Sequence, residues 1–220
     1  MYAPGVDPEF TLEFHHPLDP TPGTGIVLAM EVELTDIKSL DDQLDAAERD
    51  AQALVRGLSE AQAGWRAEPG SWSVAECLDH LATANSVYLR AMHGPAARAR
   101  EQGRLRRRPA VPGVVGRWFV RSLEPPVRPR FKVNAPQAIR PRTAPSLGDA
   151  FAGFTASQNE VREFLRAYAD LDLAAVRFPN PFIRGVRFSL ATGLHVITAH
   201  ERRHLWQAWR VRQAAQRALG

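Results

Sequence analysis

The chain has 220 residues, of which 45% are hydrophobic, so it can bury a core, and its length fits one domain better than two. It contains no run approaching the roughly 18 to 20 apolar residues that cross a bilayer, and its N-terminus lacks the pattern of a secretory signal. We therefore expect a cytoplasmic protein. Its single cysteine, Cys77, excludes an internal disulfide and lies in an apolar helical pattern typical of a buried packing residue.

The net charge of +4 is unevenly distributed along the chain. Residues 95–145 contain 13 Arg and Lys against two acids, so this stretch carries +11 and the rest of the chain carries −7. Such a stretch could bind the phosphates of a nucleic acid. Its nine prolines favour instead a solvated connection that packs across an acidic protein, and we rank nucleic-acid binding as the second alternative.

Residues 1–29 carry Gly, Pro and polar residues without a sustained period, and a helical pattern follows Met30. We interpret residues 1–29 as a disordered N-terminal extension and residues 30–220 as the folded domain. His15 and His16 lie in the extension, and we expect them to be solvent-exposed rather than metal ligands.

Four later segments show apolar residues at the three- and four-residue steps of an amphipathic helix. Two begin with helix-capping residues: Ser73-Val74-Ala75-Glu76 is a capping box, and Ser146 precedes another helical pattern. At the end of the second segment, His93 precedes Gly94, and we expect it to cap that helix. The four predicted helices span about 39–58, 73–92, 146–169 and 189–218.

Two connections separate these helices. Residues 95–145 form a long Pro/Arg-rich connection with one short helix around its apolar residues 114–120, and residues 171–188 form a loop over the helices. Four long helices with one extended crossover predict an all-α fold, a four-helix bundle whose facing side chains can build a metal site.

The sharpest chemical signal is His200-Glu201-Arg202-Arg203-His204. Positions i and i+4 of a helix share a face about 6 Å apart along the axis, so two imidazoles there can bind one metal ion. The string also matches the HExxH motif of metalloproteases, with Glu201 as general base. The extended version of that motif needs Gly and His where this chain has Gln207 and Arg210, and no acid follows His204.

A third ligand must therefore come from earlier in the chain, and His80 is the best candidate. It lies in the second predicted helix beside apolar residues, although a buried histidine bonded to a backbone carbonyl is an ordinary alternative. His195 is a weaker candidate because it is about 140° around the last helix from His200. The neighbouring Asp79 points elsewhere, and we expect it to be solvated.

Two segments resemble the DinB-like (YfiT-like) metalloenzyme family. Trp72 through Leu81 resembles that family's "W-S-hydrophobic-x-E-x-L-x-H-L" segment, and His195 through Gln207 resembles its closing "H-x-x-x-x-H-E-x-R-H-x-x-Q" segment. With the proline-rich text before the third and fourth helices, the resemblance covers most of residues 36–213. It implies a four-helix bundle with one divalent metal ion held by His80, His200 and His204.

Three imidazoles leave a coordination position for water or substrate, as in a catalytic site. Nitrogen ligands suit zinc, nickel or iron, and zinc is our preferred ion. The resemblance implies either hydrolysis or transfer reactions of a low-molecular-weight thiol with a small-molecule substrate. Glu201, Arg203 and Gln207 are candidate helpers, with Glu201 and Gln207 expected to orient the imidazoles. The alternative is a metal-binding stress-response protein without turnover, and a homodimer is plausible in either case.

Overall fold

The computed structural model describes residues 22–126 and 135–219, with side chains from Thr35 onward, and this part of the chain is mostly helical. Its two short strands pair antiparallel, Phe178 opposite Phe188. The all-α prediction is confirmed. The elements are α1 (Pro22–Val55), α2 (Glu60–Gly64), α3 (Val74–Glu101), α4 (Val114–Leu123), the 3-10 turn η2 (Gln137–Ile139), α5 (Leu147–Tyr168), β1 (Arg177–Pro179), β2 (Arg187–Ser189) and α6 (Leu190–Leu219).

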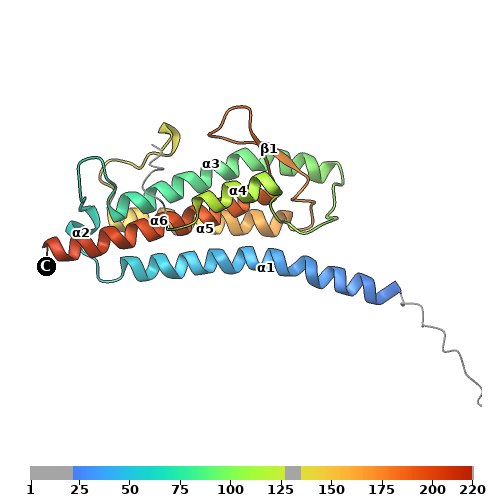
Figure 1. The fold of residues 1–220 in the computed structure, drawn as a ribbon, viewed down its shortest axis with the longest axis horizontal. Coiled ribbons are helices and arrows are strands. Elements are labelled where there is room, and N and C mark those ends of the chain that lie inside the picture. The colour runs from blue at the N-terminus through green and yellow to red at the C-terminus, as the bar shows by residue number, and fades with distance from the viewer. Residues whose placement is uncertain (1–21, 127–134, 220) are drawn as a thin grey trace, which may run out of the picture.

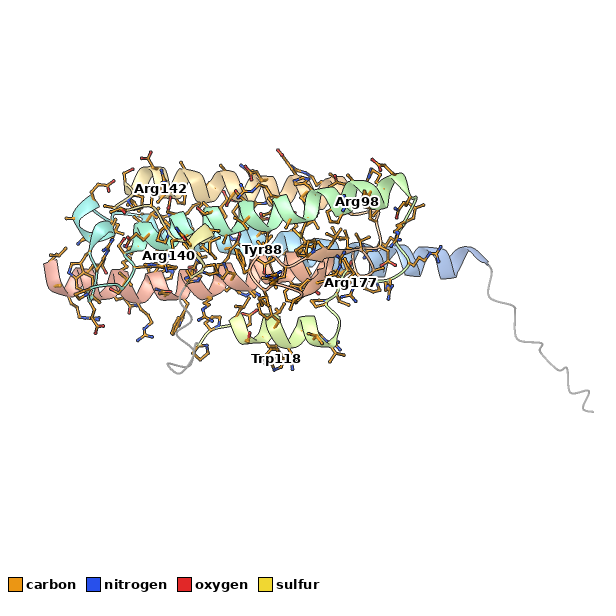
Figure 2. The ribbon with its side chains drawn as sticks, turned by 90° about the horizontal axis from the view of Figure 1, so that it is seen from above. Tyr88, Arg98, Trp118, Arg140, Arg142 and Arg177 are labelled. Carbon is orange, nitrogen blue, oxygen red and sulfur yellow. The ribbon has the colours of Figure 1, made fainter. Side chains whose placement is uncertain are left out.

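The long helices α1, α3, α5 and α6 run side by side (Figure 1). Helix α3 packs against α5 and α6, and α1 packs against the same two helices from the other side. The short helix α4 lies outside this group against α6, with Trp118 directed away from the long helices (Figure 2). The connection from α3 to α5 therefore crosses the outside of the molecule.

Helix α1 begins at Pro22, earlier than the predicted start near residue 39. The predicted extension lies mostly at residues 1–21, which are outside the described residues, as are His15 and His16. The domain boundary at Met30 stays a prediction.

Helix α3 begins as predicted but ends later. Ser73 and Glu76 form the reciprocal capping box, with the backbone N–H of Glu76 donating to the Ser73 hydroxyl at 3.2 Å. The helix continues through Pro95 to Glu101 because Ala96 and Ala99 are buried, and this packing outweighs the hydrogen bond that proline removes. The prediction that His93 caps the helix is therefore wrong.

The Pro/Arg-rich connection contains the predicted short helix, α4, and packs against the long helices through ion pairs. Arg106 contacts Asp36 at 2.6 Å, and both side chains are nearly buried. Arg108 pairs with Asp172, beyond α5, and Arg100 near the end of α3 pairs with Asp170. These pairs support the interpretation that the basic stretch lies across acidic parts of the fold.

The predicted loop over residues 171–188 instead contains β1 and most of β2. The hairpin packs its buried Phe178 close to Gly193 at the start of α6. A Cβ atom on Gly193 would lie 2.5 Å from the Met92 sulfur and 2.9 Å from the Phe178 ring. Glycine at this position is therefore what lets α3, α6 and the hairpin meet.

The core consists of two apolar clusters with a polar layer between them. One cluster lies toward the hairpin and the other toward α2. Each of α3, α5 and α6 contributes apolar residues to both clusters, from different parts of its length. Between the two clusters the buried side chains are polar: Asn85, Ser157, Gln158, Thr198 and Glu201. His200, the neighbour of Glu201 in the chain, lies on another face of α6 and contacts His80.

Candidate metal centre

His80 of α3 meets His200 and His204 of α6. One ring nitrogen from each histidine lies within 4.8 Å of the other two. The Nε2 atoms of His80 and His200 are 3.2 Å apart. Tetrahedral coordination at Zn–N distances of about 2.0 to 2.1 Å separates two ligand nitrogens by about 3.3 Å. The three side chains, predicted from separate motifs, are thus grouped so that they could hold one metal ion.

Hydrogen bonds at the opposite ring nitrogens direct Nε2 of two histidines toward this point. Nδ1–H of His80 donates to the carbonyl oxygen of Ile139, in η2, at 2.5 Å. Nδ1–H of His204 donates to Oε1 of Gln207 at 3.0 Å, so Gln207 lies where the sequence predicted. Each bond leaves Nε2 unprotonated in the neutral ring, which is the form that binds a metal.

The site is partly closed to solvent, and this keeps the rings neutral. His80 is 1% and His204 9% exposed, and the Trp72 ring covers both, with centroids 4.5 and 5.6 Å away. Burial lowers the pKa of His200 to about 3, and His80 and Arg203 add to this effect. Burial lowers the pKa of His204 well below its usual value and also lowers that of His80. Proton competition for the three rings is therefore weak at neutral pH.

Asp79 does not face solvent, which corrects the prediction that it is solvated. Its side chain is 6% exposed and accepts hydrogen bonds from the backbone N–H and Nε of Arg142, each at 2.7 Å. Arg142 follows η2 by three residues, so this contact fixes the connection beside His80. This pairing could not be predicted from the sequence because the partners are 63 residues apart.

Glu201 lies between two of the histidines in sequence but faces the core. Its Oε1 accepts a hydrogen bond from Asn85 at 2.8 Å, and Asn85 also donates to Ser157. Burial raises the pKa of Glu201 to about 7, although the side-chain amides of Asn85 and Gln158 act to lower it. The carboxylate contacts Asn85 rather than an imidazole, so its placement does not suit the general base of the HExxH reading.

The remaining candidates lie away from the three histidines. His195 contacts the carbonyl oxygen of Ala110 through Nε2 at 3.2 Å. His93 packs its ring against Phe164 and Tyr168. Cys77 is fully buried, as predicted, and burial raises its pKa, so it is unsuited to act as a nucleophile. Within the described residues, no second group of three such side chains could hold a metal ion.

Sequence reasoning missed Ile139, whose contribution is a backbone carbonyl, and the contact of Arg142 with Asp79. Arg140 and Arg142 lie along α3 on the α2 side of the molecule (Figure 2). Two arginines on either side of Pro141 form no periodic pattern that would identify them as residues near the site. The only available signal was the concentration of arginines in the connection.

Comparison with known families identifies the chain. The family model of the DinB superfamily matches residues 43–208, which include all three histidines, η2 and the supporting Gln207. The chain belongs to the DinB superfamily. No curated protein and no solved structure matches it. No helix in the part of the chain that the structure describes has the length and apolar character to span a bilayer.

Proposed function

We propose that this protein is a metal-dependent enzyme in which His80, His200 and His204 hold one divalent ion, with zinc preferred over nickel and iron. The main support for this proposal is that three imidazoles from two helices converge, with the Nε2 atoms of His80 and His200 3.2 Å apart. In the metal-free protein a neutral His200 can donate its Nε2–H to Nε2 of His80, and once that proton is released both nitrogens could bind one ion, so the donor set fits a metal ion.

The reaction class we propose is hydrolysis, or transfer of a low-molecular-weight thiol to a small-molecule substrate. A divalent ion held there would supply Lewis acidity that makes a nucleophile available near neutral pH. The protein's own residues orient and shield the site. The Ile139 carbonyl and Gln207 hold two imidazoles in one tautomer, and Trp72 excludes water from one side.

Metal analysis of the purified protein tests the ligand set. We expect about one equivalent of divalent metal per chain, and its loss in His80→Ala and His204→Ala. His195→Ala is the matched control. His195 is a partly buried histidine of α6, the helix that carries His204, and its ring contacts the Ala110 carbonyl instead. Full metal content in His80→Ala would refute the site.

Activity screens with ester, amide and thiol-conjugate substrates then separate the enzyme from its alternative. The alternative is a metal-binding stress-response protein, which would hold stoichiometric metal without turnover of any substrate. Nucleic-acid binding has less support, because four arginines of the basic stretch contact carboxylates of the same chain: Arg100 near the end of α3, and Arg106, Arg108 and Arg142 of the connection. Absence of a gel shift at low salt would exclude it.

A homodimer stays a prediction, and α4 is the surface on which we test it. Val114, Val115 and Trp118 are between 71% and 75% exposed, and an interface would bury such a patch. Sedimentation of the wild-type protein and of Trp118→Glu checks this: a dimer formed through α4 dissociates in the variant. A wild-type monomer at high concentration would contradict the prediction.

A further inference from the structure

Arg203 shares a face of α6 with the metal-site residues. His200, Arg203, His204 and Gln207 stand at positions i, i+3, i+4 and i+7, which form one stripe along a helix. The guanidinium is close enough that its charge lowers the pKa of both His200 and His204. Arg203 itself is only partly buried. A partly exposed cation therefore lies beside a site that would itself hold a cation.

Arg203 is a partly buried arginine that contacts no carboxylate among the side chains that the structure describes. Arg202, its neighbour, bonds Glu124, while Arg66 pairs with Glu76 and Arg142 with Asp79. Among the described side chains no salt bridge or hydrogen bond involves Arg203, and partial burial lowers its pKa. The connection residues 127–134 contain no acid that could serve. Within the described residues, the guanidinium is therefore partly desolvated without a carboxylate beside it, which costs free energy.

We propose that Arg203 binds an oxyanion group of the substrate, a carboxylate or a phosphate, beside the metal site. A planar guanidinium is suited to hold such a group through two parallel hydrogen bonds. The bound anion would also offset the repulsion between Arg203 and the metal ion. This inference rests on the proposed function for the role of the metal, and it narrows the substrate to small molecules that carry an anionic group.

Calorimetric titration with malonate, inorganic phosphate and neutral malonamide tests the inference on zinc-loaded protein. The variants are Arg203→Met and Arg203→Lys, and the matched control is Arg210→Met, an exposed arginine of the same helix that stacks on Trp206. We expect at least one anion to bind wild type and Arg210→Met about tenfold or more tighter than Arg203→Met, with Arg203→Lys between them. Malonamide binding should not depend on Arg203.

Repeating the titrations on chelator-treated protein separates this inference from the proposed function. If wild type holds no zinc, the proposed function fails, and Arg203-dependent anion binding by the metal-free protein would still support the anion site. Equal anion affinity in wild type and in correctly folded Arg203→Met, in both forms of the protein, overturns the inference. Absence of binding of both anions to wild type, in both forms, also overturns it.

Discussion

Asp79 holds Arg142 by its backbone N–H and its guanidinium, and this contact ties the connection to α3 one residue before a candidate metal ligand. We predict that Asp79→Ala weakens zinc affinity by about tenfold or more, because the Ile139 carbonyl no longer holds the His80 ring. Competition with a chromophoric chelator measures the affinity.

Asp170→Ala is the control for that substitution, since Asp170 forms a more exposed ion pair with Arg100 near the end of α3. It should leave zinc affinity unchanged. Unaltered zinc affinity in Asp79→Ala would mean that the connection does not position His80.

The lowered imidazole pKa values predict that zinc binding tolerates mild acid. An imidazole is neutral above its pKa, and burial lowers the pKa of His200 to about 3, so its neutral range extends below that of a solvated histidine. We expect zinc affinity to stay nearly constant between about pH 7 and 5.5, where ordinary histidines with pKa near 6.5 would lose it. Competition titrations across this range check the prediction, and a steep loss starting at pH 6.5 would contradict it.

The buried carboxyl of Glu201 predicts that the folded state loses stability as the pH rises. Burial raises its pKa from 4.5 to about 7, so the folded state holds a proton that the unfolded state has released between these values. Its contribution is therefore complete below about pH 4.5 and decreases as pH rises to 7, by about 3 kcal/mol. Urea unfolding of metal-free wild type and Glu201→Gln measures it. The stability of the variant relative to wild type should rise across this window, and a constant difference would refute the assignment.

Gly193→Ala tests the close packing of α3, α6 and the hairpin. The added methyl group would overlap the Met92 sulfur and the Phe178 ring, so we expect a loss of about 2 kcal/mol in the free energy of unfolding. Gly148→Ala is the matched control in α5, where no atom lies within 4 Å of the added carbon. That substitution should leave stability unchanged or raise it slightly.

Local patterns predicted those parts of the fold and site that depend on neighbouring residues in the chain. The capping residues Ser73 and Ser146 mark helix starts because their hydroxyls accept backbone N–H groups within one turn. His200 and His204 are recognisable because helical spacing places both on one face. His80 was found by its apolar surroundings together with the family resemblance.

The features that sequence reasoning missed depend on packing between distant segments. Helix α3 passes through Pro95 because the next turn is buried, which local propensity cannot show. The hairpin of β1 and β2 has strands of three residues, too short for an alternating pattern to stand out. Asp79 carries a charge typical of a solvated residue, and only the three-dimensional structure reveals its partner.

The contact that holds the His80 ring comes from the main chain of the connection. Every amino acid provides the same carbonyl oxygen, so replacing the side chain at position 139 cannot remove this acceptor. A change in the length of the chain beside Ile139 can remove it from the reach of the His80 ring. An insertion or deletion between Ile139 and Arg142, which Asp79 holds in place, would shift the oxygen away from the imidazole and leave the His80 ring without its acceptor.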